Sequence, residues 1–168
     1  MTQSALKIMF IGAMGVGKTS LVKRLVTGEF SSDYKSTLGV QLSQLTIGAS
    51  NGPRDLVLWD TDGDTGEAIL QSRYVIGTDA TVIVCDVQRP KTLDTLLGLA
   101  SAMEDALPGR PCLGVCNKVD LADMPKETAT LLNYTCDITA ATSALSGEGI
   151  EDAISRLVSL ADERKADL

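Results

Sequence analysis

The chain has 168 residues, of which 44% are hydrophobic and 22% are charged, a composition typical of one globular domain with a buried core. Its net charge of −7 disfavours DNA, RNA and anionic membrane surfaces, so we expect no nucleic-acid partner. The sequence contains no histidine, which excludes histidine-based triads, general bases and metal ligands.

In chain order, short apolar runs alternate with helical patterns, which is typical of βαβ units around a mainly parallel sheet. Asn51-Gly52 favours a tight hairpin, so the second and third strands should pair antiparallel. Residues 60–79 and 121–134 have the least regular pattern, and the segment 123–134 is short and weakly helical. The expected strands are Leu6–Ile11, Gln41–Ile47, Leu56–Trp59, Ala80–Cys85, Cys112–Cys116 and Cys136–Ala140; the expected helices are Lys18–Thr27, Lys91–Ala106 and Glu148–Arg164.

These elements predict an α/β fold in a single domain covering residues 1–168, with a six-stranded, mostly parallel sheet, one antiparallel strand and helices on both faces. The four cysteines lack zinc-site spacing, and we expect buried thiols rather than disulfides or nucleophiles. The N-terminus has no signal-peptide pattern, and no apolar run approaches the length of a membrane span. The C-terminal residues RKADL offer no cysteine for prenylation, so we expect a cytoplasmic protein without a direct lipid anchor.

The stretch GAMGVGKTS follows the first expected strand and opens the first expected helix. It fits the pattern G-x-x-x-x-G-K-[ST], in which glycines let backbone N–H groups wrap a phosphate. Lys18 is placed to bridge the β- and γ-phosphates, and the Thr19 hydroxyl to bind Mg²⁺. A glycine-rich turn without a ligand is the weaker alternative. The residues expected at the phosphates are Gly12, Met14, Gly15, Val16, Gly17, Lys18, Thr19 and Ser20.

The base is indicated by Asn117-Lys118-Val119-Asp120, at the end of the strand Cys112–Cys116. A carboxylate at Asp120 accepts two hydrogen bonds from guanine N1–H and N2–H₂, a donor pair that adenine lacks. Adenine would leave this carboxylate unpaired, and a site of this kind can favour the correct ligand by about 10⁴-fold or more. The four-residue pattern also occurs in ordinary turns, but the carboxyl end of a parallel strand is where open α/β sheets bind ligands.

With these two motifs, the chain resembles the Ras-like small GTPases, most closely the Rab branch, from about Leu6 to Ala161. The resemblance implies a P-loop NTPase domain that binds GTP or GDP with Mg²⁺. It places the first switch at 34–40, beginning with Tyr34, where Thr37 closes on Mg²⁺ and the γ-phosphate. Phe30 corresponds to the aromatic residue packed on guanine.

The same resemblance makes WDTDG, residues 59–63, the second switch. Asp60 is then the carboxylate on the metal side, and Gly63 donates a backbone N–H to the γ-phosphate. Thr142-Ser143-Ala144, followed by Leu145, matches the base-binding loop, with the Ala144 N–H at guanine O6. Asn117 should tie this loop to the phosphate loop, and the Lys118 stem should cover the base. Each of these residues also has an ordinary explanation when taken singly. Thr37 could be a loop hydroxyl, Phe30 a core aromatic at the end of a helix, and Thr142-Ser143 a turn.

The chain departs from the family pattern at several positions. Asp62 replaces an alanine, and Asp64 replaces the glutamine that orients the attacking water, so we expect slow hydrolysis with intact GTP binding. Three explanations of the acidic pair remain open: solvated side chains, an extra cation, or pairing with a basic residue such as Arg73 or one from a partner. Met14 should crowd the route of an activating partner's arginine, and Leu145 replaces a lysine.

The leading hypothesis is a guanine-nucleotide switch with slow GTPase activity, in which Lys18, Thr37, Gly63 and Asp64 form the catalytic set. Effector, exchange and activating proteins would bind through residues 31–42 and 60–76. The alternative is a nucleotide-loaded interaction module with negligible turnover. A P-loop ATPase or kinase is disfavoured by Asn117–Asp120.

Overall fold

The computed structural model describes residues 3–31, 33, 39–61, 63 and 66–167. Its strands and helices follow the alternating order expected from the sequence. The strands are β1 (Leu6–Gly12), β2 (Val40–Ala49), β3 (Gly52–Thr61), β4 (Ala80–Asp86), β5 (Cys112–Asn117) and β6 (Ile138–Ala141). The α-helices are α1 (Lys18–Thr27), α2 (Pro90–Ala106), α3 (Lys126–Thr135) and α4 (Ile150–Ala166), and two short 3₁₀ helices are η1 (Gly66–Gln71) and η2 (Arg73–Val75).

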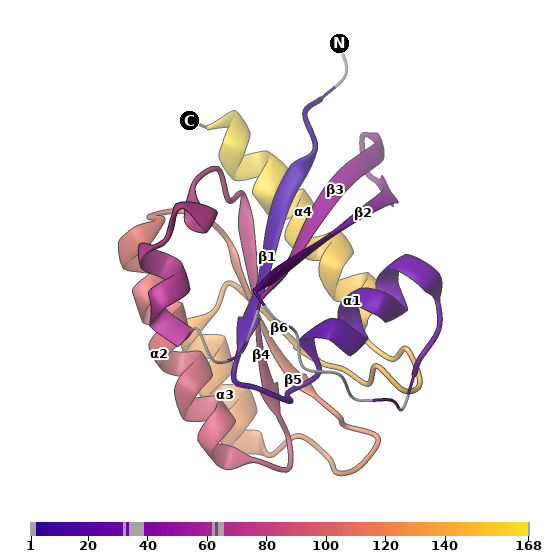
Figure 1. The fold of residues 1–168 in the computed structure, drawn as a ribbon, viewed down its shortest axis with the longest axis vertical. Helices are drawn as coiled ribbons and strands as arrows, with labels where there is room; N and C mark the ends of the chain where they lie inside the picture. Colours follow the sequence, from indigo (N-terminus) through magenta and orange to yellow (C-terminus); the bar gives the residue numbers. More distant parts are fainter. Residues whose placement is uncertain (1–2, 32, 34–38, 62, 64–65, 168) are drawn as a thin grey trace.

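The six strands form one sheet in the order β2-β3-β1-β4-β5-β6. β2 and β3 are antiparallel, and the other neighbouring pairs are parallel. Figure 1 shows the sheet between α2 and α3 on one side and α1 and α4 on the other. The predicted α/β fold, with a mostly parallel six-stranded sheet and one antiparallel strand, is therefore confirmed.

The hairpin predicted at Asn51-Gly52 is present, with Ala49 opposite Gly52 in the ladder. Gly52 has a φ of +107°, a conformation that favours glycine. Both strands of the hairpin are longer than expected, because the antiparallel ladder runs unbroken from Val40 opposite Thr61 to the turn. Residues 60–79 include the end of β3 and the two 3₁₀ helices.

The segment expected to be weakly helical does contain a helix, but the strand expected to begin at Cys136 begins later. Residues 126–135 form the regular helix α3, and Cys136 ends it by donating its N–H to the carbonyl of Leu132. β6 therefore begins only at Ile138. The helix forms despite its weak pattern because Leu132 is buried against the sheet, a contact that local sequence does not show.

Alternate residues of β1 face opposite sides of the sheet, as the strand period requires. Ile8 and Phe10 pack in a core formed with α1 and α4, whereas Met9 and Ile11 pack in a second core under α2 and α3. All four side chains are nearly or fully buried. Burial on both faces fixes β1 at the centre of the sheet and, with it, the loop that follows Gly12.

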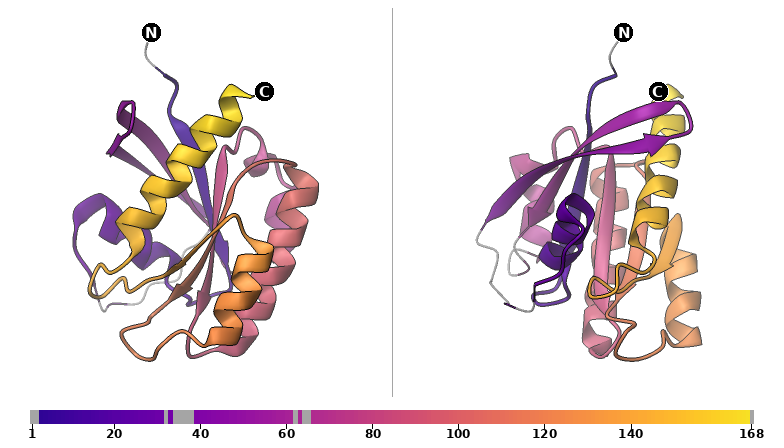
Figure 2. Two further views of the ribbon diagram at one scale, coloured as in Figure 1. Left: turned by 180° about the vertical axis from the view of Figure 1, so that it is seen from behind. Right: turned by 90° about the vertical axis from the view of Figure 1, so that its right-hand side faces the viewer.

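β3 lies on one side of β1 and β4 on the other. The chain forms the β2–β3 side first and then crosses to the β4 side, so the strand order reverses at β1. Open α/β sheets bind ligands outside the carboxyl ends of the strands at such a point. In Figure 1, the loops that follow β1, β4, β5 and β6 all lie at the lower end of the molecule. Figure 2 shows both termini and the β2–β3 turn at the opposite end.

Candidate nucleotide-binding site

The loop between β1 and α1 requires glycine at both ends of its motif. Gly12 has a φ of +147°, and a Cβ there would lie 2.4 Å from the carbonyl oxygen of Val84. Gly17 has a φ of +103°, and a Cβ there would lie 2.3 Å from Nδ2 of Asn117. Glycine therefore allows the loop to pack directly against β4 and against the end of β5.

Lys18 begins α1 and is almost fully buried, with 5% of its surface exposed. Its Nζ donates to the carbonyl oxygens of Gly12 and Ala13, at 2.9 Å each. The ammonium thus lies within the curve of the loop, beside the N-terminus of a helix. Thr19 and Ser20 follow in the first turn, where backbone N–H groups and the helix dipole favour an anion.

Thr19 and Asp60 bring two oxygen groups together beside the loop. The Thr19 hydroxyl donates to Oδ2 of Asp60 at 2.6 Å, which joins the start of α1 to the end of β3. Asp60 is 2% exposed. A hydroxyl and a carboxylate are the hard oxygen donors that Mg²⁺ prefers, so the residues present fit this ion.

Asn117 links the phosphate loop to the loop after β6. Its Nδ2 donates to the carbonyl oxygen of Val16 at 3.0 Å, and its Oδ1 accepts from the Thr142 hydroxyl at 2.9 Å. The Val119 N–H in turn donates to the carbonyl of Thr142. Asn117 and Thr142 are both buried. Three segments far apart in the sequence are thus held in one arrangement, including the link that the family resemblance implied for Asn117.

Lys118 adopts a φ of +68°, which is uncommon for a residue other than glycine. Its Nζ donates to the carbonyl of Gly15 at 2.8 Å and forms an ion pair with Asp86, also at 2.8 Å. The Lys118 side chain therefore extends from the end of β5 across to the phosphate loop.

The residues expected around the base lie in adjacent loops. The Ser143 hydroxyl donates to Oδ1 of Asp120 at 2.7 Å and accepts from the Ser146 N–H at 3.1 Å. Ala144 is buried beside them, whereas Leu145 is 52% exposed. Ser143 thereby fixes the orientation of the Asp120 carboxylate.

The backbone of Gly63 lies directly against the phosphate loop. A Cβ on Gly63 would be 2.4 Å from the Met14 nitrogen and 2.8 Å from the Ala13 carbonyl carbon, so only glycine fits. The Met14 side chain is 42% exposed, and Phe30, which follows α1, is 38% exposed. Four further residues singled out from the sequence lie outside the described residues, namely Tyr34, Thr37, Asp62 and Asp64.

Two contacts at the base loop were not anticipated from the sequence. Asp86, at the end of β4, pairs with Lys118, and its position at the carboxyl end of a parallel strand is a signal that could have identified it. Arg24 on α1 donates to the carbonyl of Ser146 at 3.0 Å, and a Cβ on Gly147 would lie 2.8 Å from its guanidinium. No local sequence pattern marks Arg24 for this role.

Trp59 in β3 lies close to Tyr74 in η2 and to Lys7 in β1. The rings of Trp59 and Tyr74 are 5.9 Å apart, and Nζ of Lys7 lies 3.8 Å from the centre of the Trp59 ring. Burial lowers the pKa of Lys7 from its usual value, and the nearby Asp79 carboxylate opposes this shift. Tyr74 is 45% exposed.

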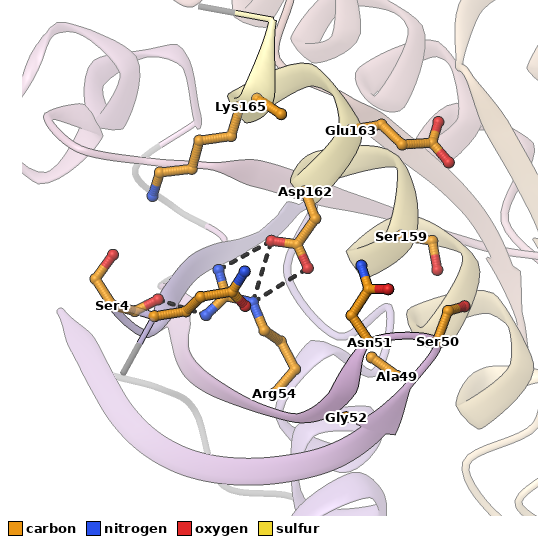
Figure 3. Close-up of a pocket in the computed structure, with 12 residues that line it drawn as sticks. Ser4, Ala49, Ser50, Asn51, Gly52, Arg54, Ser159, Asp162, Glu163 and Lys165 are labelled. Atoms are coloured by element: carbon orange, nitrogen blue, oxygen red, sulfur yellow. Dashed lines mark hydrogen bonds and ion pairs between the residues drawn. The ribbon is translucent and has the colours of Figure 1, made fainter. Parts of the chain in front are cut away.

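A cavity of about 600 Å³ lies away from these loops, beside the β2–β3 turn and the end of α4 (Figure 3). Arg54, 4% exposed, spans it by pairing with Asp162 at 2.9 Å and donating to the carbonyl of Ser4. The buried arginine is therefore paired, and it joins the hairpin to the C-terminal helix.

The cysteines are free and buried, as predicted. A hydrogen bond with Cys116, together with burial, raises the pKa of the Cys85 thiol. Cys112 is affected in the same way by Cys136. A raised pKa leaves little thiolate at neutral pH, so Cys85 and Cys112 behave as apolar side chains.

Comparison with known proteins identifies the family. Residues 7–163 match the model of the Ras family. The chain belongs to the Ras family. This Ras-family chain is 36% identical over 131 residues to the Ras-related protein Rab-7b of Bos taurus; the alignment covers 74% of the chain and 65% of that relative. The predicted resemblance to Ras-like proteins and to the Rab branch is confirmed. Across its described residues, no helix is both long and apolar enough to cross a bilayer.

Proposed function

We propose that the protein is a guanine-nucleotide switch that binds GTP and GDP with Mg²⁺ and slowly hydrolyses GTP. The observation that supports this most strongly is the pair of hydrogen bonds made by Asn117, to Val16 in the phosphate loop and from Thr142 in the base loop. A phosphate loop and a base loop held at a fixed distance suit a ligand that contains both a purine and a polyphosphate.

The phosphate side of the proposal rests on backbone N–H groups and one ammonium. Lys18 contacts two carbonyls of the loop, which supports a contact between its ammonium and the β- and γ-phosphates. Gly63 is close enough to the loop for its N–H to reach the same phosphate. The proposed phosphate contacts are Gly12, Met14, Gly15, Val16, Gly17, Lys18, Thr19, Ser20, Tyr34, Thr37 and Gly63.

Thr19, Asp60 and Thr37 are the proposed ligands of Mg²⁺. When bound, the ion neutralises negative charge on the phosphates. The contact between Thr19 and Asp60 supports this assignment, because it places two oxygen ligands at one point beside the loop.

For the base, Asp120 is proposed to accept from guanine N1–H and N2–H₂, with Ser143 holding the carboxylate in place. The Ala144 N–H would donate to O6. Lys118 and Phe30 would cover the two faces of the ring, and Leu145 would lie at its edge. An adenine base would leave Asp120 without its donor pair.

The switch itself is proposed to be the ordering of residues 31–42 and 60–76 around the γ-phosphate, which effector, exchange and activating proteins would read. Exposed apolar side chains in these segments support a protein-binding role: Leu42 is 58% exposed, Tyr74 45% and Ile76 72%. Slow hydrolysis follows from Asp64, since a carboxylate there would be repelled by the phosphates.

The proposal is tested by the nucleotide that co-purifies with the protein, identified by chromatography after denaturation, and by displacement of a fluorescent guanosine diphosphate in Mg²⁺ buffer. We expect GDP or GTP in the first experiment. In the second, GTP should displace the probe efficiently, ITP, which lacks the 2-amino group, should do so weakly, and ATP should have little effect. Displacement by ATP as effective as that by GTP would contradict the proposal.

A further inference from the structure

Arg89 makes an unanticipated contact with the phosphate loop. It lies between β4 and α2, and its Nη2 donates to the carbonyl oxygen of Met14 at 2.7 Å. The side chain is largely exposed. Among the described residues, the Arg89 guanidinium makes no other hydrogen bond. The contact ties the phosphate loop to the start of α2.

The two carbonyls that follow Met14 are held in the same way. Gly15 accepts from Nζ of Lys118 at 2.8 Å, and Val16 accepts from Nδ2 of Asn117 at 3.0 Å. Three consecutive carbonyl oxygens of the loop are thus each bonded to a side chain. The donors lie at the carboxyl ends of two strands: Arg89 comes after β4, Asn117 is the last residue of β5, and Lys118 follows it.

Because the peptide unit is planar, the orientation of each carbonyl fixes the orientation of the N–H group of the next residue. In a planar trans peptide, the carbonyl of one residue and the N–H of the next point in opposite directions. The peptide bonds of the loop are trans. Holding the Met14 carbonyl therefore holds the Gly15 N–H on the other side, just as the Gly15 and Val16 carbonyls orient the N–H groups of Val16 and Gly17.

We propose that Arg89 is a positioning residue for phosphate binding, which acts by anchoring the Met14 carbonyl so that the Gly15 N–H faces the phosphates of the nucleotide. This inference rests on the proposed function. The Arg89 side chain differs from those of Lys118 and Asn117 because, among the described residues, it bonds neither to the base loop nor to the Asp86 carboxylate. Its loss should weaken the contact with the phosphates and leave recognition of the base intact.

The test compares the variants R89M and R89K with wild type. Methionine keeps much of the apolar stem but has no donor, whereas lysine restores a charged donor. We expect R89M to bind GDP and GTP about three- to tenfold more weakly, the effect of one lost hydrogen bond, and R89K to recover much of the affinity. Guanosine, which has no phosphate, should bind wild type and R89M with the same inhibition constant when it competes with the fluorescent GDP probe.

Two controls separate anchoring from a general charge effect. R156M removes an exposed arginine on α4 and should bind GDP as wild type does. High salt screens long-range attraction between exposed charges, so a loss due to the hydrogen bond should persist in R89M at high ionic strength. The ³¹P resonance of bound GDP should also shift in R89M and not in R156M.

Failure of wild type to bind GDP would overturn the proposed function, and this inference with it. Wild-type binding combined with an unchanged affinity and ³¹P spectrum in R89M would overturn the inference alone. So would a loss that R156M shares or that high salt abolishes.

Discussion

Thr19 donates its hydroxyl hydrogen to Oδ2 of Asp60 across 2.6 Å, joining the first turn of α1 to the last residues of β3. The contact places a hydroxyl and a buried carboxylate beside the phosphate loop. It is also the point where the two halves of the proposed Mg²⁺ site meet, since Thr19 follows the glycines of the phosphate loop and Asp60 belongs to the proposed second switch.

Replacing Thr19 with valine should therefore weaken nucleotide binding chiefly when Mg²⁺ is present. Valine keeps the shape but removes the hydroxyl, and loss of a group that orients or binds a metal costs about 10- to 100-fold in affinity. The dissociation rate of fluorescent GDP, measured with Mg²⁺ and with excess EDTA, checks this. We expect faster release in Mg²⁺ and little change in EDTA. Thr130→Val, which removes a hydroxyl bonded within α3, should behave as wild type.

Replacing Gly12 with alanine should strongly destabilise the fold. The new Cβ would lie 2.4 Å from a backbone oxygen of β4, and neither strand can move without disturbing the central sheet. Gly28→Ala is the matched control, because Gly28 also has a positive φ, +73°, but has open space around its Cβ position. Urea unfolding should show a cost of about 1–2 kcal/mol for Gly28→Ala and at least about 3 kcal/mol for Gly12→Ala. Equal costs would show that the close approach to Val84 is unimportant.

Replacing Ser143 with alanine should weaken guanine recognition without affecting the phosphates. The hydroxyl holds one oxygen of Asp120, and a hydrogen bond to a charged group is worth about 1.5–3 kcal/mol. We expect about tenfold weaker GDP binding and a smaller preference for GTP over ITP, measured by probe displacement. Ser159→Ala, whose hydroxyl bonds within α4, is the control. An unchanged preference would mean that Ser143 does not orient the carboxylate.

Replacing Asp64 with glutamine should accelerate GTP hydrolysis. A carboxylate about 5 Å from a phosphate oxygen is repelled by about 3 kcal/mol at an effective dielectric constant of about 20, whereas glutamine is neutral and can orient water. Single-turnover hydrolysis by wild type and D64Q, each preloaded with GTP, measures the effect. A variant no faster than wild type would exclude Asp64 as the cause of slow turnover.

Trp59 should report whether the protein switches. It is the single tryptophan of the sequence, it precedes Asp60, and it packs 5.9 Å from Tyr74. We expect its fluorescence to differ between the GDP form and the form with a non-hydrolysable GTP analogue, because Trp59 is the first residue of the proposed second switch. Identical spectra, together with identical rates of proteolysis in residues 31–42, would favour the nucleotide-loaded module over the switch.

The sequence by itself determined the order of the elements, the hairpin at Asn51-Gly52 and the phosphate-loop motif. Each of these depends on residues close together in the chain: strand and helix periods, a turn dipeptide, and glycines next to a lysine. The joint presence of this motif and Asn117–Asp120 was also enough to indicate the Ras family, which the match over residues 7–163 shows.

The tertiary structure decided what local patterns do not contain. Helix α3 is regular because Leu132 is buried against the sheet, and the positions of Gly12 and Gly17 allow only glycine because Val84 and Asn117 approach them. Arg89 stands next to Met14 although 75 positions separate them. Contacts of this kind arise when the sheet brings the ends of its parallel strands to one edge, so side chains from distant segments meet there without any trace in the local sequence.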